Sequence, residues 1–271
     1  MSKINANELA KQFPNYQIIR LLGEPGGQGE VFLIQLEDDS KAALKIYYPA
    51  NLVFRINREI EAIKQIQSEA MVDLIEAGTI TLSSQSCKYL ITSYIAGKDL
   101  RTFLTEGNRL SNDQAVKVCK RISKAIDELW KKRIVHRDIK PDNILLSDKG
   151  DFYLIDLGIA KYLDKTTLTA AGRNPGTLGY MSPEQALGYR NLTLKSDIFA
   201  LGITVFECVT GNHPFNSDQN LIGCKDPQTL DYSQFQDTFL KDLVRRMIRI
   251  RPADRPSSGD VIQKLETTRR S

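Results

Sequence analysis

Apolar and polar positions follow different periods in two parts of the chain. Up to about residue 95 the apolar residues form short runs with the length and composition of β-strands. The expected strands are 16–22, 30–36, 41–48, 72–81 and 88–95. Between the third and fourth, isoleucines recur at helical spacing and predict a helix over 55–66. This part is therefore expected to be a small, sheet-rich lobe with one main helix.

Beyond Gly97 the helical period dominates. The segment 112–132 is amphipathic and follows a capping residue, either Ser111 or Asn112. The segment 196–210 is so apolar that it predicts a buried central helix, and further helices are expected over 236–250 and 257–267. We therefore expect an α+β fold with two lobes. The expected parts are an N-terminal extension (1–15), the sheet-rich lobe (16–94) and a larger, mostly helical lobe (95–271).

Composition and charge narrow the class of protein. The 271 residues are 41% hydrophobic and 26% charged, which excludes a disordered or fibrous chain. The formal charge of +4 is too small to indicate nucleic-acid binding. No apolar run is long enough for a membrane span, and the N-terminus lacks the apolar core of a signal peptide. The spacing of the four cysteines fits neither zinc binding nor a disulfide framework, so we expect a cytoplasmic chain with reduced thiols.

The most specific motif is H-R-D-I-K-P-D-N, from His136 to Asn143, directly after an apolar helix. It resembles the catalytic loop of protein kinases, H-R-D-x-x-x-x-N. The resemblance implies that Asp138 orients the hydroxyl of the substrate and that Lys140 places a positive charge beside the γ-phosphate. It also implies that Asn143 supplies an oxygen ligand for Mg²⁺.

A second motif, Asp156-Leu157-Gly158, follows a strand-like run. It is similar to the metal-binding D-F-G of kinases, with Leu in place of Phe. By this resemblance Asp156 holds Mg²⁺, or Mn²⁺ as an alternative ion, against the β- and γ-phosphates of ATP.

The glycine cluster between the first two strands resembles the kinase glycine-rich loop in part. Gly26, Gly29 and Val31 match the last three positions of G-x-G-x-x-G-x-V, whereas Gly23 stands one residue too early. Without side chains, Gly26, Gly27 and Gly29 would let backbone N–H groups close on phosphate. Taken alone the cluster would fit an ordinary hairpin, and the flanking strands and a downstream lysine favour the phosphate-binding loop.

That lysine is Lys45, in Ala43-Leu44-Lys45, which is similar to the kinase A-x-K. The resemblance implies that Lys45 contacts the α- and β-phosphates. A lysine within an apolar run needs a partner, and the helix over 55–66 offers Glu59, with Glu61 as the alternative.

The run 89–95 resembles the kinase hinge, which holds adenine through backbone groups. The resemblance assigns the backbone contacts to Ser93 and Ile95 and places Thr92 at the back of the nucleotide pocket. The apolar faces around the adenine would come from Val31, Ala43 and Leu145.

Three further residues are implied to have structural roles. Ser182-Pro183-Glu184 resembles the Ala-Pro-Glu that ends a kinase activation segment. A buried Glu184 needs a cation, and Arg255 is the family's usual partner. Asp197 matches the aspartate that binds the backbone of the catalytic loop.

The segment between Asp156 and Glu184 predicts a regulatory switch. It contains Thr166, Thr167 and Thr169, and Arg137 lies beside Asp138. A phosphate on one of these threonines could be gripped by Arg137, with help from Lys161. The alternative is a polar loop without a switch.

Together the motifs resemble those of a bacterial Ser/Thr protein kinase. The resemblance implies the two-lobed kinase fold, with an antiparallel sheet and one main helix in the small lobe and a larger, mostly helical second lobe. The implied activity is transfer of the γ-phosphate of Mg-ATP to Ser or Thr of a protein substrate, with autophosphorylation by a second copy in a kinase dimer. Two alternatives are an ATP-binding pseudokinase and a small-molecule phosphotransferase of kinase-like fold. Lys45, Asp138 and Asp156 argue against the first, and Arg137 and Glu184 against the second. The end at Ser271 fits either a whole kinase or an excised domain.

Overall fold

The computed structural model describes residues 4–25, 29–48, 60–61, 63–156, 179–224 and 226–267. The chain separates into two compact units. The first contains residues 1–65 and 72–95, and the second contains 66–71 and 96–271.

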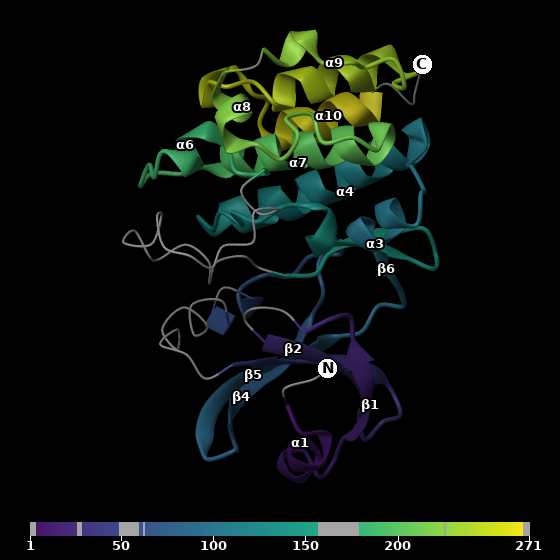
Figure 1. Cartoon of the computed structure of the whole chain (residues 1–271), viewed down its shortest axis with the longest axis vertical. Helices are drawn as coiled ribbons and strands as arrows, with labels where there is room; N and C mark the ends of the chain where they lie inside the picture. Colours follow the sequence, from purple (N-terminus) through teal and green to yellow (C-terminus); the bar gives the residue numbers. More distant parts are fainter. Residues whose placement is uncertain are drawn as a thin grey trace. The chain divides into compact units, whose positions relative to one another are not determined.

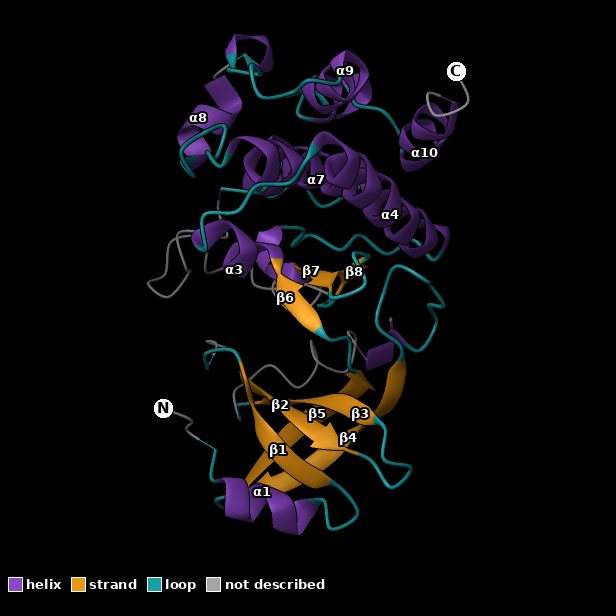
Figure 2. Cartoon of the chain, turned by 90° about the vertical axis from the view of Figure 1, so that its right-hand side faces the viewer, coloured by secondary structure: helices purple, strands orange, loops and turns teal. Residues whose placement is uncertain are grey.

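The first unit is built on a five-stranded antiparallel sheet (Figure 2). Its strands are β1 (Gln17–Leu22), β2 (Gly29–Gln35), β3 (Lys41–Tyr47), β4 (Leu74–Leu82) and β5 (Gln85–Ser93), in the order β1-β2-β3-β5-β4. The predicted sheet is confirmed, with bounds that differ from the expected ones by up to three residues.

One face of this sheet is covered by helix α1 (Ala6–Gln12), which the sequence analysis did not predict (Figure 1). The side chain of Asn5 caps the helix by accepting hydrogen bonds from the N–H groups of Asn7 and Glu8. Leu9 and Phe13 are buried in a core that includes Phe32 and Leu44. The segment 1–15, expected only as an extension, therefore contributes to the core of the first unit.

The expected helix over 55–66 lies mostly outside the described residues. Residues 60, 61 and 63 are helical, and the side chains of Ile60 and Ile63 are buried as the isoleucine spacing predicts. Glu59 lies outside the described part.

The second unit is mostly helical, as predicted. Its main helices are α4 (Asn112–Lys131), α7 (Leu194–Thr210), α9 (Thr238–Met247) and α10 (Ser258–Thr267), with the shorter α3 (Leu100–Thr105), α6 (Pro183–Ala186) and α8 (Gln219–Cys224). Helix α4 starts with a capping box in which Ser111 and Gln114 exchange hydrogen bonds, so Ser111 is the cap. Short 3₁₀ helices occupy Pro141–Asn143 (η1), Pro227–Thr229 (η4) and Pro252–Asp254 (η5).

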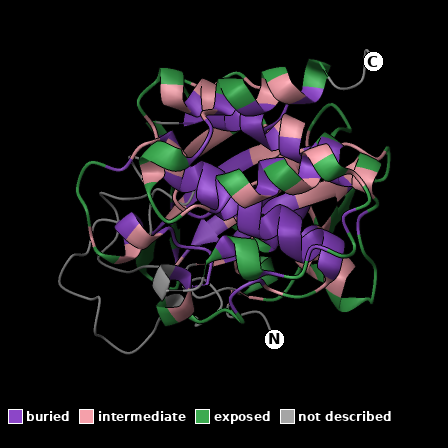
Figure 3. Cartoon of the chain, turned by 90° about the horizontal axis from the view of Figure 1, so that it is seen from above, coloured by how far each residue is buried: buried purple, intermediate pink, exposed green. Residues whose placement is uncertain are grey.

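Helix α7 is the centre of this unit. Every residue of α7 except Lys195 is buried, and α4, α9 and α10 pack against it. Figure 3 shows buried residues in purple and exposed residues in green along the helices. This confirms the predicted buried helix. Three short strands, β6 (Gly97–Asp99), β7 (Ile144–Ser147) and β8 (Phe152–Leu154), form a small antiparallel sheet. The loop that follows α4 leads into β7 of this sheet. In the described part of the chain, no helix is long and apolar enough to cross a membrane.

Candidate catalytic site

The loop between α4 and β7 holds a buried carboxylate. Asp138 is only 4% exposed. The amide nitrogen of Asn143 donates to both its carbonyl oxygen, at 2.7 Å, and its Oδ2, at 2.6 Å. Lys140 Nζ lies 3.9 Å from the same Oδ2. The three residues that the loop motif singles out are therefore brought together, and Asn143 fixes the orientation of the Asp138 carboxylate.

Asp197 in α7 binds the backbone of this loop. Its two carboxylate oxygens accept the N–H groups of His136 and Arg137, each at 2.8 Å. Burial raises the pKa of Asp197 to about 7, although the two backbone donors favour the charged form. Asp197 thus makes the contact expected from the sequence.

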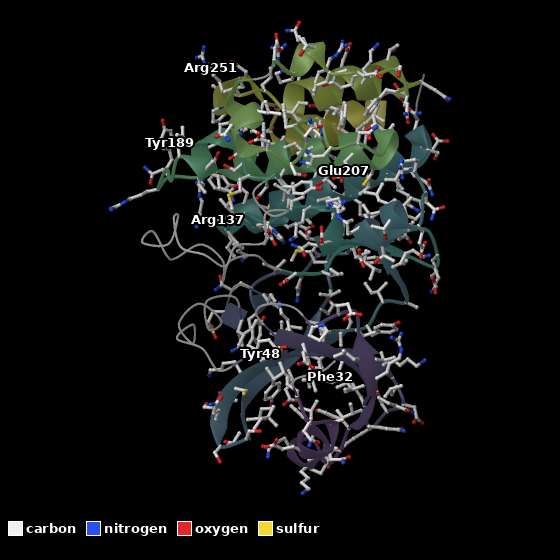
Figure 4. The ribbon with its side chains drawn as sticks, viewed as in Figure 1. Phe32, Tyr48, Arg137, Tyr189, Glu207 and Arg251 are labelled. Atoms are coloured by element: carbon white, nitrogen blue, oxygen red, sulfur yellow. The ribbon has the colours of Figure 1, made fainter. Side chains whose placement is uncertain are left out.

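Arg137, which is labelled in Figure 4, has a left-handed backbone with φ of +70°. This conformation is unusual for a residue other than glycine. Two hydrogen bonds hold it there. Its N–H is donated to Asp197, and its carbonyl accepts from Nε2 of Gln185 in α6, at 2.8 Å. A left-handed residue of this kind persists only where its surroundings hold it in place. Here the held residue is the one directly before Asp138. Gln185 was not identified from the sequence. Its side chain donates to the backbone carbonyl of a residue far away in the chain, and no local sequence pattern indicates such a contact.

The candidate metal ligands also lie near one another along the small sheet. The N–H of Ile155 donates to the carbonyl of Asn143 at 3.0 Å, and Asp156 is the next residue. Since the amide nitrogen of Asn143 donates to Asp138, its amide oxygen is the group suited to a cation. One amide and one carboxylate oxygen fit Mg²⁺, which usually takes its remaining ligands from water and phosphate. Among the described residues, no group of three or more His, Cys, Asp and Glu side chains could hold a metal.

In the first unit, the register of the sheet gathers the predicted nucleotide-binding side chains on one face. Val31 pairs with Lys45, and Ala43 pairs with Thr92. Residues directly opposite in neighbouring strands share a face, as do residues two apart in one strand. Val31, Ala43, Lys45 and Thr92 are therefore on the same face and are half-buried. The alternate residues Phe32, Leu44 and Ile91 are buried beneath α1 on the other face.

Two backbone features bear on the predicted nucleotide contacts. A Cβ at Gly29 would lie 2.0 Å from the carbonyl oxygen of Ile46, so only glycine fits where β2 meets β3. The N–H of Ser93 is donated to the carbonyl of Asp73 at 2.9 Å. Any contact from Ser93 to adenine would therefore use its carbonyl. Ile95 follows in the first unit, and Leu145 lies on β7 of the second.

Glu184 and Arg255 form the ion pair expected of them. Arg255 Nη1 and Nη2 donate to the two carboxylate oxygens of Glu184 at 2.7 and 2.9 Å. Ser196 Oγ adds a hydrogen bond to Glu184 at 2.7 Å. The pair anchors α6, and with it Gln185, in the second unit.

The predicted residues Gly26, Gly27, Glu59, Lys161, Thr166, Thr167 and Thr169 lie outside the described part of the chain.

Comparison with known proteins agrees with the family that the sequence motifs indicate. Residues 16–265 match the protein kinase domain. The chain belongs to the protein kinase family. It is 34% identical to a probable serine/threonine-protein kinase PknB of Lactococcus lactis over 213 residues, 75% of this chain and 32% of that protein. It is 35% identical to the serine/threonine-protein kinase PrkC of Bacillus subtilis over 209 residues, 75% of this chain and 31% of that protein.

A third relative is the serine/threonine-protein kinase PknD of Mycobacterium tuberculosis, 34% identical over 219 residues, 78% of this chain and 32% of that protein. The chain thus spans about a third of the length of the curated relatives it matches. The predicted resemblance to bacterial Ser/Thr kinases is confirmed.

Proposed function

We propose that this chain transfers the γ-phosphate of Mg-ATP to serine or threonine hydroxyls of a protein. The observation that carries this proposal is the buried Asp138, with its carboxylate fixed by Asn143 and Lys140 Nζ 3.9 Å away. Phosphoryl transfer depends mainly on positioning and charge neutralisation. Asp138 would accept a hydrogen bond from the acceptor hydroxyl and orient it, and Lys140 would stabilise negative charge on the transferred group.

The same proposal assigns roles to the other candidate residues. Asn143 and Asp156 would hold Mg²⁺, which neutralises phosphate charge when it is bound. Lys45 and the glycine-rich loop with Gly26, Gly27 and Gly29 would bind the phosphates, with Glu59 as the partner of Lys45. Thr92, Ser93 and Ile95 would contact the adenine, between the apolar side chains of Val31, Ala43 and Leu145.

The test compares Asp138→Asn with Asp148→Asn, which changes an exposed acid in the turn between β7 and β8. Phosphate incorporation from Mg-ATP is measured in a library of Ser- and Thr-containing peptides. Loss of a transition-state contact costs about 10²–10³ in rate, so Asp138→Asn should be nearly inactive and Asp148→Asn should match the wild type. Equal activity of all three proteins would defeat the mechanism. A wild type that binds Mg-ATP and phosphorylates nothing would be a pseudokinase.

We also propose that the chain phosphorylates a second copy of itself at Thr166, Thr167 or Thr169. A phosphate there adds about −1.5 to −2 charge and acceptor oxygens that Arg137, with Lys161, would bind. Two hydrogen bonds fix the backbone of Arg137 directly before Asp138, so its side chain starts from a defined place in the catalytic loop. Mass spectrometry after incubation with Mg-ATP tests the modification, and replacement of all three threonines by alanine tests its effect. Active protein without phosphate, together with full activity of the triple variant, would remove this part of the proposal.

We propose the cytoplasm as the location of this part of the chain. ATP is available there, and Cys87, Cys119 and Cys208 are buried free thiols.

A further inference from the structure

A glutamate of the first unit is buried at the start of β2. Glu30 is only 1% exposed, and its Oε1 accepts hydrogen bonds from two other segments of the chain. One comes from the hydroxyl of Tyr48, directly after β3, at 2.9 Å, and one from the N–H of Ile4, ahead of α1, at 3.3 Å. Tyr48 is labelled in Figure 4. The N-terminal segment, β2 and the end of β3 therefore meet at one carboxylate oxygen.

Glu30 stands between two residues that are predicted to contact the nucleotide. Gly29 precedes it and belongs to the predicted phosphate-binding loop, and Val31 follows it and is predicted to pack against the adenine. Successive side chains of a strand point to opposite faces. Glu30 therefore shares the face of Phe32, which packs in the core with α1. Its carboxylate holds the start of β2 from the face opposite the predicted nucleotide contacts.

The hydrogen bond with Tyr48 ties β2 to β3 at the end of their ladder. Glu30 is directly opposite Ile46, and Tyr48 follows two residues later, a diagonal position from which a long side chain can reach across. Burial and the hydrogen bond to Glu30 raise the pKa of Tyr48 to about 12, so its hydroxyl stays protonated and donates. Val31 is opposite Lys45 in the same ladder. A shift of β2 would therefore move Val31 relative to Lys45.

The N–H of Ile4 comes from a segment that is held in place by other contacts. Helix α1 buries Leu9 in the core of the first unit. Glu8 of the same helix accepts the N–H of Ser83, in the turn between β4 and β5, and the Ser83 hydroxyl at 3.1 Å. Ile4 and α1 precede residue 16, where the match to the protein kinase domain begins. The family resemblance therefore assigns no role to the contact between Ile4 and Glu30.

We propose that Glu30 is a positioning residue for ATP, through which Tyr48 and the N-terminal segment hold β2 in the place that nucleotide binding requires. This proposal rests on the proposed function, since it takes Gly29 and Val31 as nucleotide contacts. If β2 is in place in only a fraction of the molecules, the apparent affinity for ATP falls by that fraction. The residues proposed to act on the acceptor hydroxyl lie in the second unit, so the KM for peptide would stay unchanged.

The experiment compares the kinetics of Tyr48→Phe with those of a matched control, Tyr16→Phe. Tyr16 is also half-buried in the first unit, and its hydroxyl donates to Glu76 at 2.7 Å. The hydrogen bond to Glu76 and burial raise its pKa to about 12 as well. A hydrogen bond contributes a factor of about 2 to 10 to an equilibrium constant. Tyr48→Phe should therefore raise the KM for ATP by about this factor and leave the KM for the best library peptide unchanged, whereas Tyr16→Phe should leave both KM values unchanged.

A second pair of variants tests the N-terminal segment. Ile4→Pro removes the N–H that binds Glu30, and its control Ile4→Ala keeps this N–H while it removes most of the side chain. Ile4→Pro should raise the KM for ATP as Tyr48→Phe does, and Ile4→Ala should match the wild type. A rise in Tyr48→Phe without a rise in a folded Ile4→Pro would remove the N-terminal segment from the proposal. If Ile4→Pro does not fold, Tyr48→Phe, which keeps the shape of the side chain, decides on Glu30.

Two further measurements do not depend on phosphate transfer. The Kd for Mg-ATP, from isothermal titration calorimetry, should rise in Tyr48→Phe and Ile4→Pro and stay unchanged in the two controls. Amide hydrogen exchange in residues 29–35, measured without nucleotide, should become faster in Tyr48→Phe and Ile4→Pro but not in Tyr16→Phe.

The outcomes separate the two proposals. A wild type that phosphorylates nothing would defeat the kinase proposal, and the Kd for Mg-ATP with the exchange of residues 29–35 would still decide on Glu30. An active wild type whose KM for ATP and exchange are unchanged by Tyr48→Phe and Ile4→Pro would overturn the role of Glu30 alone. An equal rise in the KM for ATP in Tyr16→Phe would also overturn it, because a general loosening of the sheet would then account for the effect.

Discussion

At the scale of single residues, the Arg255 guanidinium shows how a buried charge is accommodated. Its two contacts with Glu184 are joined by hydrogen bonds to the carbonyls of Arg249, Lys195 and Ile250, at 2.6, 3.0 and 2.6 Å. These contacts match the five N–H donors of a guanidinium. Burial alone would raise the pKa of Glu184, but the hydrogen bonds and charge of Arg255 outweigh it and lower the pKa.

Arg255→Ala should therefore destabilise the protein strongly. The substitution leaves the Glu184 carboxylate buried without its cation, at a cost of about 3–5 kcal/mol. The control is Arg251→Ala, since the Arg251 side chain is 79% exposed and lies 3.9 Å from Asp254. The free energy of unfolding in urea should fall in Arg255→Ala and stay within about 0.5 kcal/mol of the wild type in Arg251→Ala. Similar values for both variants would show that the buried pair is dispensable.

His213 predicts a dependence of stability on pH. Its Nδ1 accepts the N–H groups of Phe215 and Ser217, at 3.1 and 2.9 Å, and its Nε2 lies 3.0 Å from the carbonyl of Gly179. Burial lowers the pKa of His213, while the charges of Glu207 and Arg101 act in opposite directions. The folded state thus favours the neutral ring, with the proton on Nε2.

Because the folded pKa is below the unfolded value of about 6.5, the stabilisation is present above that pH and is lost as pH falls below it. The free energy of unfolding, measured from pH 8 to pH 5, should decline more steeply in the wild type than in His213→Asn. Parallel curves would mean that protonation of His213 is not coupled to unfolding.

From local patterns, contacts between residues that are close in the sequence could be predicted, whereas contacts between residues that are far apart in the sequence could not. Asp138 and Asn143 lie five positions apart in one loop, so a single sequence motif contains both residues and indicates that they lie close together. Gln185 and Arg137 are 48 positions apart, and neither their contact nor the positive φ of Arg137 is indicated by a sequence motif.

At the scale of elements, α1 stabilises the sheet of the first unit from outside the residues that match the protein kinase domain. The family match begins at residue 16, whereas α1 spans Ala6–Gln12. Leu9 is fully buried, and Phe13 packs edge-on against Tyr89, with ring centroids 4.9 Å apart. The helix therefore closes an apolar face that would otherwise be open to water.

Leu9→Ala should lower the stability of the protein by about 2–5 kcal/mol, because it leaves a cavity between α1 and the sheet. The matched control is Leu187→Ala, which makes the same chemical change at a side chain that is 70% exposed. Chemical denaturation followed by circular dichroism measures both. A loss in Leu9→Ala no larger than in Leu187→Ala would show that α1 does not contribute to the core.

Element length explains which elements the sequence could predict. Helices α4 and α7, of 20 and 17 residues, show their pattern over several turns. Helix α1 has seven residues and offers only Leu9 and Phe13 as apolar positions on the buried face, so no period can be recognised. Strands β6 and β8 have three residues each, and their pairing with β7 depends on long-range contacts.

At the scale of the whole molecule, the fold class was predictable because the motifs occur in the family's order from one end of the chain to the other. The division into units contains one feature that the sequence did not indicate. Residues 66–71 group with the second unit, where the N–H of Leu154 donates to the carbonyl of Ala70 at 2.8 Å and Met71 forms a parallel bridge with Leu154. This connection depends on tertiary contacts with β8, so no local pattern identifies it.

Binding of Mg-ATP should stabilise the whole chain. A ligand that binds only the folded state, at 100 times its Kd, adds about 2.7 kcal/mol to the free energy of unfolding. For a protein of this size that corresponds to a rise in Tm of roughly 5 to 10 °C. The predicted ligands of the cation are Asn143 and Asp156, so EDTA should reduce the rise by removing Mg²⁺.

The variant that tests the phosphate contact is Lys45→Met, and its matched control is Lys64→Met. Lys64 pairs with Glu61 at 2.9 Å on the surface, with its side chain 51% exposed, so its loss should leave the response to Mg-ATP intact. Lys45→Met should shift the dependence of Tm on ATP concentration to higher ATP, because a charge that favours the bound phosphates is removed. A thermal shift titration measures all three proteins with and without EDTA. An unchanged titration for Lys45→Met would exclude Lys45 from phosphate binding, and an unchanged rise in EDTA would exclude a metal requirement for nucleotide binding.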